Sequence, residues 1–173
     1  MFRRLRLQFI MIASLAILFI LVFTVGIINT VRSFQTEQEI SKVLNTLTEN
    51  NGSFGKTKKI ETNQGREIPS DSFRFFSVTL SDDKIVSQDT SHTSLINDEE
   101  AARYALTVSR LTNNLGTIRE KNINLSYQVS KVSKDKILVV FLDTTSYYNS
   151  SQALLSLSIL LSLFGFIFFV VIV

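Results

Sequence analysis

The sequence predicts an α+β domain held between two membrane-spanning helices. Two observations support this prediction: two long apolar runs contain no charged residue, and the segment between them alternates strand-like and helix-like patterns. The runs cover residues 9–28 and 153–173. At ~1.5 Å per residue, each would form a helix ~30 Å long, which matches the hydrocarbon thickness of a bilayer. A pair of buried core helices is the alternative, but a small domain cannot enclose two helices that are apolar on all sides.

The distribution of charge predicts how the chain crosses the membrane. The formal net charge is +3, and Arg3, Arg4 and Arg6 account for all of it because the remaining basic and acidic residues balance as 15 − 15 = 0. Basic residues before a first apolar run favour a cytoplasmic N-terminus. The basic balance therefore indicates topology, and no nucleic-acid partner is expected.

Domain boundaries follow from these two runs. We expect a cytoplasmic basic N-terminus at 1–8, a first transmembrane helix at 9–30, an extracytoplasmic domain at 31–152 and a second transmembrane helix at 153–173. The first run is too long for a signal peptide and lacks a small-x-small cleavage site, so it is expected to remain as an anchor. The chain has no cysteine, so the outer domain must rely on its core, as fits a bacterial surface protein.

The first helix is expected to continue beyond the membrane. Ile40, Val43, Leu44 and Leu47 share one helical face, and no Gly or Pro interrupts the pattern before Asn51-Gly52, where the helix should stop. Two helices with a break near the membrane surface are the alternative. Residues 53–72 suggest no firm structure, although a loop of this length could hide a short strand.

The remaining external elements are two hairpins with a helix between them. Residues 73–80 and 85–89 form strands joined by a turn at "SDDK", and residues 123–130 and 137–143 form a second pair. The helix begins at an Asn97 N-cap with Glu100 three residues on, and "TNNLG" is expected to end it. Strand 123–130 should have one wet face, whereas strand 137–143 is apolar throughout and suits the sheet centre. A four-stranded antiparallel sheet with helices on one face resembles the PAS-like sensor fold.

No catalytic, cofactor-binding or metal-ligating residue is predicted. The chain lacks a Gly-rich phosphate loop, a nucleophile elbow and an HExxH pair. The single histidine, His92, is expected to be an exposed or locally hydrogen-bonded loop residue; a pH-sensing role is the alternative. The lysines of "FGKTKKI" are expected to be a solvated face, with contact to an anionic ligand as the alternative. Four aromatic side chains could line a pocket between sheet and helix, although such residues are more often core. They are Phe73, Phe75, Tyr104 and Tyr127.

Several strings resemble the start of sensor histidine kinases of Gram-positive bacteria. These are "MFRRLRLQFIMIASLAILFIL", "FRFFSVTLSDDKIVSQDT" with "INDEEAARYALTV", and "YQVSK…ILVVFLDTT". The resemblance implies the signal-sensing and transmembrane part of a two-component kinase in the plasma membrane, with the chain truncated before its catalytic domains. It further implies a homodimer, an external signal of unknown identity and a cytoplasmic response regulator. The absent kinase part would use ATP and Mg, and no catalytic residue carries over to this chain.

Two functional alternatives to a sensor kinase remain open. The outer domain could serve another output, such as a cyclic-dinucleotide synthase or a chemoreceptor. The chain could also be a complete two-pass membrane binding or accessory protein. In each reading, Ser158, Ser162 and Gly165 place small residues along the second apolar helix, where they would allow close packing on a neighbour; ordinary membrane composition explains them equally well.

Overall fold

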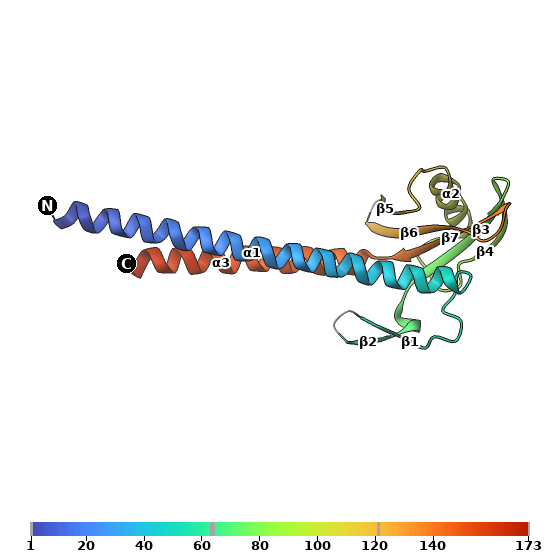
Figure 1. Ribbon diagram of the computed structural model, residues 1–173, viewed down its shortest axis with the longest axis horizontal. Helices are drawn as coiled ribbons and strands as arrows, with labels where there is room; N and C mark the ends of the chain where they lie inside the picture. Colours follow the sequence, from blue (N-terminus) through green and yellow to red (C-terminus); the bar gives the residue numbers. More distant parts are fainter. Residues whose placement is uncertain (1, 63–64, 121, 173) are drawn as a thin grey trace. The chain divides into compact units, whose positions relative to one another are not determined.

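The computed structural model describes residues 2–62, 65–120 and 122–172. The chain divides into two compact units. The helical unit comprises Met1–Gln35 and Asn149–Val173, and the sheet unit comprises Thr36–Tyr148. Figure 1 shows the elements of both units in chain order.

Two long helices carry the apolar runs. Helix α1 spans Phe2–Glu49 and helix α3 spans Thr145–Ile172, and both are long and apolar enough to cross a membrane. Large apolar side chains lie exposed along them; Phe9, for example, is 76% exposed. The mixed α+β class with two apolar helices is therefore confirmed at this level. The membrane orientation and the boundaries at 8, 30 and 152 stay predictions.

Helix α1 is continuous, so the alternative of two helices with a break is wrong. Its last turns belong to the sheet unit, where the four predicted apolar side chains are buried. The helix ends as expected, because Asn51 and Gly52 adopt φ values of 55° and 85° and the Gly52 amide donates to the Leu47 carbonyl at 2.8 Å. Left-handed residues of this kind satisfy the last carbonyls of a helix.

The sheet unit contains a five-stranded antiparallel sheet, so the expectation of four strands is wrong. Its strand order is β4-β3-β7-β6-β5. The strands are β3 (Phe75–Ser81), β4 (Lys84–Asp89), β5 (Leu115–Glu120), β6 (Ile123–Lys131) and β7 (Lys136–Asp143). The segment 53–72 does hide strands: β1 (Lys59–Glu61) pairs with β2 (Glu67–Pro69), and a short 3-10 turn, η1 (Ser70–Ser72), follows.

Strand β5 is the one that the sequence does not reveal. Helix α2 (Asp98–Ser109) ends before "TNNLG", and Leu115 and Gly116 of that string begin the strand by pairing with Gln128 and Tyr127. A Cβ atom at Gly116 would lie 2.6 Å from the Tyr127 hydroxyl oxygen. The glycine that suggested a helix end is therefore required because a neighbouring ring covers its backbone.

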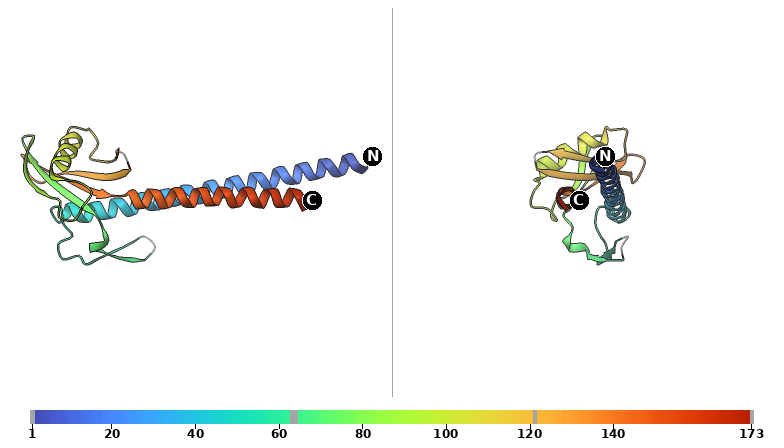
Figure 2. Two further views of the ribbon diagram at one scale, coloured as in Figure 1. Left: turned by 180° about the vertical axis from the view of Figure 1, so that it is seen from behind. Right: turned by 90° about the vertical axis from the view of Figure 1, so that its left-hand side faces the viewer.

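Helices cover both faces of the sheet, and not one face as predicted (Figures 1 and 2). Alternate side chains of β7 enter two separate cores. Val139 and Phe141 pack with α2, whereas Leu138, Val140 and Leu142 pack with the last turns of α1 and with Ile60 of β1. Strand β7 is apolar throughout because both of its faces are covered, which confirms its central position.

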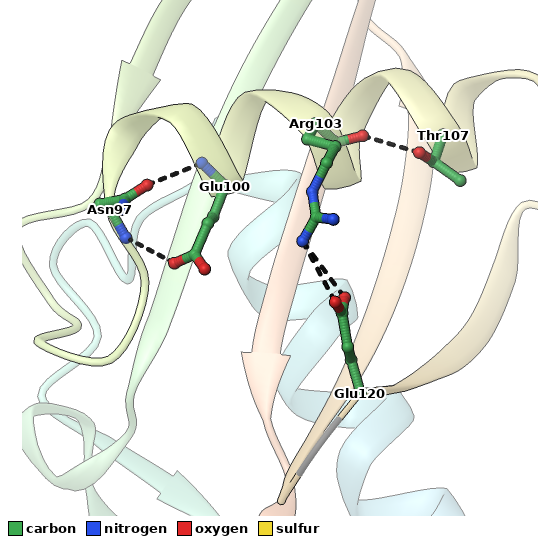
Figure 3. Close-up of polar contacts among 5 residues, drawn as sticks. All are labelled: Asn97, Glu100, Arg103, Thr107 and Glu120. Atoms are coloured by element: carbon green, nitrogen blue, oxygen red, sulfur yellow. Dashed lines mark hydrogen bonds and ion pairs between the residues drawn. The ribbon is translucent and has the colours of Figure 1, made fainter.

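The structure confirms the predicted β3–β4 turn and the predicted N-cap of helix α2. The β3–β4 hairpin turns through Asp82 and Asp83, which both have positive φ and match the twist of paired strands. Helix α2 has the predicted capping box, in which the Asn97 side chain accepts from the Glu100 amide at 2.8 Å and Glu100 accepts from the Asn97 amide. Figure 3 shows this cap together with the ion pair between Arg103 and Glu120.

Candidate functional site: the junction of sheet and helices

The passage from the sheet into α3 is a single residue. Strand β7 ends at Asp143 and α3 begins at Thr145, so only Thr144 lies between them, and it is 0% exposed. Its amide and its hydroxyl both donate to the Asn124 carbonyl on β6, at 2.8 and 3.1 Å. The chain therefore leaves the sheet at a point that is hydrogen-bonded to the neighbouring strand.

The first turn of α3 continues this attachment. The Asn124 amide donates to Thr145 Oγ1 at 2.9 Å, and the Thr145 amide donates to Asp143 Oδ1 at 2.9 Å. Asp143 thus satisfies one of the amides that a helix start leaves unpaired. Both backbone polar groups of Asn124 bind residues of the junction, so α3 cannot shift along β6 without breaking several bonds.

A chain of hydroxyl groups extends the junction across the sheet. Ser126 Oγ lies 3.1 Å from Thr144 Oγ1 and 3.2 Å from Thr117 Oγ1 on β5. Ser126 is only 2% exposed, so the prediction of a wet face on this strand is wrong at its centre. Ser126 therefore binds hydroxyl groups of β5 and of the junction, where the sequence pattern predicts a side chain in contact with water.

Gln128, further along the same face of β6, contacts α1. Its Nε2 atom donates to Asn45 Oδ1 at 2.8 Å. Its Oε1 atom is buried and has no hydrogen-bond partner among the residues that the structure describes. A buried acceptor without a partner costs roughly 1–3 kcal/mol. The unpaired Gln128 Oε1 atom therefore lowers the stability of the packing between α1 and the sheet.

Two tyrosines of the first α3 turn contact two further elements. The Tyr147 hydroxyl donates to Glu39 Oε1 on α1 at 3.3 Å, and its ring packs against the core cluster beside α1. The Tyr148 ring lies under the Arg119 guanidinium of β5, 5.2 Å from the ring centroid, a cation–π distance. The start of α3 is therefore held by α1, β5 and β6 together. We call this set of contacts the junction.

The four aromatics proposed to line a pocket do not come together. Phe73 and Phe75 belong to the core on the α1 side, while Tyr104 and Tyr127 belong to the core on the α2 side. The sheet separates the two pairs. They act as core residues, which was the alternative interpretation of the same pattern.

His92 is exposed in its loop, as expected, but its ring stacks on Phe75 with centroids 4.4 Å apart. The loop beside it is fixed by Asp89, whose Oδ1 atom accepts from the Ser91 hydroxyl and amide at 2.6 and 3.0 Å. These two hydrogen bonds hold the pKa of Asp89 below its ordinary value because they stabilise the charged carboxylate. The pH-sensing role of His92 stays untested.

Among the described residues, neither the lysines of "FGKTKKI" nor the small residues of α3 are arranged as a ligand-binding site. Lys56 and Lys58 are exposed, and Lys59 pairs with Glu67 across the β1–β2 hairpin at 2.5 Å. Exposed pairs of this kind contribute little to stability. Ser158 Oγ donates to the Leu154 carbonyl of its own helix, and no atom lies within 4 Å of a Cβ built on Gly165.

Within the described ranges, no group of three or more His, Asp or Glu side chains could hold a metal ion. No protein-family model matches the chain, and no curated protein matches it significantly. The junction, formed by residues for which the sequence predicts no site, is thus the feature on which a function can be built. The alternation of Asn124, Ser126 and Gln128 is the sequence signal for it, although that pattern by itself predicts a face in contact with water.

Replacing Thr144 with valine is expected to destabilise the sheet unit by about 1–3 kcal/mol, because the change removes a buried hydroxyl that binds Asn124 and Ser126 while preserving shape. Urea unfolding of the full chain in micelles, followed by tyrosine fluorescence, measures this loss. Thr107→Val is the matched control, since its hydroxyl binds the Arg103 carbonyl on an exposed helix surface and should change stability by less than ~0.5 kcal/mol. Equal effects of the two substitutions would contradict the role of Thr144.

Proposed function

We propose that this chain is the extracytoplasmic sensing and transmembrane signalling part of a two-component sensor histidine kinase. In this proposal the sheet unit is a PAS-like sensor domain outside the plasma membrane, and the two apolar helices carry its state to a cytoplasmic kinase domain. ATP and Mg would serve that kinase domain, and a response regulator would receive its phosphate. The proposed working form is a homodimer that responds to an external signal.

The observation that carries this proposal is that, among the residues that the structure describes, no loop separates the domain from either apolar helix. Helix α1 runs without interruption from its apolar part into the core, where Ile40, Val43 and Leu44 are buried. Strand β7 passes into α3 through one buried residue, Thr144. A flexible linker would absorb a change in the domain, whereas regular elements transmit a small translation or rotation.

The architecture also favours a sensor domain over a passive anchor. An antiparallel sheet with helix α2 inserted between its β3–β4 hairpin and its remaining strands is compatible with a PAS-like arrangement. Ligands act on such domains by shifting the population of two packings that are close in free energy. In this proposal the junction is where two such packings would differ, because it joins the first turn of α3 to α1, β5 and β6.

The coding sequence that follows Val173 gives the most direct test. We expect it to encode a cytoplasmic helix with a phosphoacceptor histidine and an ATP-binding domain. The purified product should then phosphorylate itself on histidine with ATP and Mg, giving an acid-labile phosphate. A stop codon directly after Val173 with a stable product would favour the two-pass accessory protein. A cyclase or chemoreceptor domain would favour the other outputs.

Membrane orientation is tested by single cysteines, since the chain has none of its own. In intact cells, an impermeant thiol reagent should label Ser133→Cys in the β6–β7 turn and should not label Arg3→Cys. The expected reason is the excess of arginine before the first apolar run. Permeabilised cells, in which both positions should react, provide the control. Labelling of Arg3→Cys alone in intact cells would reverse the topology and remove the proposed function.

A further inference from the structure

The start of strand β6 lies beside the first turn of α3. Strand β6 begins at Ile123, and Leu125 pairs with Asp143, the last residue of β7. The first two residues of β6 therefore extend beyond the end of β7, and the hydrogen bond from the Asn124 amide to Thr145 Oγ1 agrees with this placement. The turn that joins β5 to β6 thus lies at the end of the sheet from which α3 departs.

Arg119 brings a positive charge to this end of the sheet. It lies on β5 opposite Asn124, its side chain is exposed, and its guanidinium carbon lies 5.2 Å from the centroid of the Tyr148 ring. The ring contacts the flat face of the guanidinium, whereas the five N–H donors of that group point outward in its plane. The cation–π contact therefore fixes the charge in place and leaves these donors available to an acceptor.

Acidic side chains at the same end of the sheet have partners of their own. Glu120 forms an ion pair with Arg103 at 3.3 Å, and Asp143 Oδ1 accepts from the Thr145 amide at 2.9 Å. Among the described residues, no carboxylate lies within ion-pair distance of Arg119, and no hydrogen bond to its guanidinium occurs. An acceptor for Arg119 must therefore come from outside the described part of the chain.

Helix α3 connects this position to the second apolar run. Tyr148 precedes the uncharged run at 153–173 by five residues within one continuous helix, which corresponds to ~8 Å along the helix axis. The headgroup region on each side of a bilayer is about 5–8 Å deep, and tyrosine is enriched at that depth. If the run spans the membrane as proposed, Tyr148 and Arg119 lie at the level of the lipid headgroups.

From these observations we infer that the α3 end of the sheet docks on the membrane surface, where Arg119, stacked on Tyr148, binds the phosphate group of a phospholipid. The planar guanidinium can donate two parallel N–H bonds to one phosphate. Anionic lipids add a longer-range attraction to a basic side chain near the surface. Because Tyr148 belongs to the junction, the lipid composition of the membrane would act directly on the start of α3.

This inference rests on the membrane crossing that is part of the proposed function, and on no other part of it. It requires neither a kinase domain nor a particular orientation, because the sheet would meet the membrane surface on whichever side it lies. A spin label at Ser162→Cys, inside the second apolar run, tests the crossing separately. Oxygen, which concentrates in the bilayer core, should relax this label more strongly than a water-soluble nickel chelate.

The docking test uses single spin labels on the full chain in phosphatidylcholine vesicles that contain a nickel-chelating lipid. Headgroup nickel relaxes a label that lies near the membrane surface. Asn122→Cys reports the turn beside Arg119, and Lys134→Cys reports the β6–β7 turn at the opposite end of the sheet; both positions are exposed. Each label is measured with and without phosphatidylglycerol in the vesicles.

Three substitutions are compared in the Asn122→Cys background. Arg119→Gln removes the charge, and Arg119→Lys keeps the charge but loses the planar group. Arg110→Gln is the matched control, because it makes the same change of charge beside Asp83 in the β3–β4 turn, 3.8 Å away. That turn lies at the end of the sheet opposite to α3, since Ser81 pairs with Lys136 at the start of β7.

Nickel should relax the Asn122 label more than the Lys134 label, and phosphatidylglycerol should increase the difference. Arg119→Gln should lower the ratio of docked to undocked chains in phosphatidylglycerol vesicles about fivefold. Arg119→Lys should retain most of the response to phosphatidylglycerol, and Arg110→Gln should change nothing.

Two results would overturn the docking while leaving the membrane crossing in place. The first is an Asn122 label that is relaxed no more than the Lys134 label although the Ser162 label lies in the bilayer. The second is equal relaxation in the parent and in Arg119→Gln, or an equal loss in Arg119→Gln and Arg119→Lys, which would indicate a structural role for Arg119. A Ser162 label outside the bilayer would overturn the docking and the proposed crossing together.

Discussion

Replacing Phe141 with alanine is expected to lower the free energy of unfolding of the sheet unit by about 3–5 kcal/mol. Phe141 is 0% exposed on the central strand, and its ring stacks on Phe76 with centroids 4.5 Å apart. Tyr104 and Tyr127 lie beside it at 6.4 and 6.2 Å. The substitution removes apolar surface and leaves a cavity that three fixed aromatic rings cannot fill.

Urea unfolding of the full chain in micelles measures this loss. The chain has four tyrosines and no tryptophan, and all four tyrosines lie in the sheet unit, so their fluorescence follows that unit alone. Val86→Ala is the control, because Val86 is 54% exposed on the edge strand β4 and should cost less than ~0.5 kcal/mol. A loss below ~1 kcal/mol for Phe141→Ala would mean that the α2-side core is not packed as described.

Replacing Gly52 with alanine is expected to lower the same free energy by about 2–4 kcal/mol, since two costs combine at this position. The residue has a φ of 85°, which strains any side chain, and the added Cβ would overlap Ser77 Cβ at 2.6 Å. To relieve this overlap, the end of α1 would have to move away from β3. That movement would also weaken the hydrogen bond from the Gly52 amide to the Leu47 carbonyl, which ends the helix.

Gly65→Ala separates these two costs. Gly65 has a similar φ of 72°, but no atom of the described residues lies within 4 Å of its built Cβ. It should therefore show the backbone cost alone, about 1 kcal/mol. The difference between the two variants measures the contact of Gly52 with β3. Equal losses at Gly52 and Gly65 would show that the close contact of Gly52 with Ser77 on β3 is absent.

The elements that the sequence predicts well are those with strong local causes. Two uncharged apolar runs define α1 and α3, the Asn97–Glu100 capping box starts α2, and the paired aspartates turn the β3–β4 hairpin. In each case the interaction that fixes the conformation lies within a few residues of the chain. The apolar composition of residues 137–143 similarly identifies the central strand.

Strand β5 lacks such a local cause. Its sequence "LGTIRE" contains a glycine and two charged residues, and its strand conformation depends on pairing with β6. The short β1 and β2 strands depend equally on packing against α1, through Ile60 and Ile68. Patterns within one segment cannot reveal a strand whose stabilising partners come from another part of the chain.

By itself the sequence determined the α+β class, the two apolar helices, the continuous α1 and the central position of β7. Only the tertiary structure decided that both sheet faces are covered, that a fifth strand exists, and that Asn124, Ser126 and Gln128 meet α1 and α3. An alternating strand records only that one face is polar. Whether that face meets water or other polar groups depends on which elements pack over it, and that is set by contacts between residues such as Asn45 and Gln128, 83 positions apart.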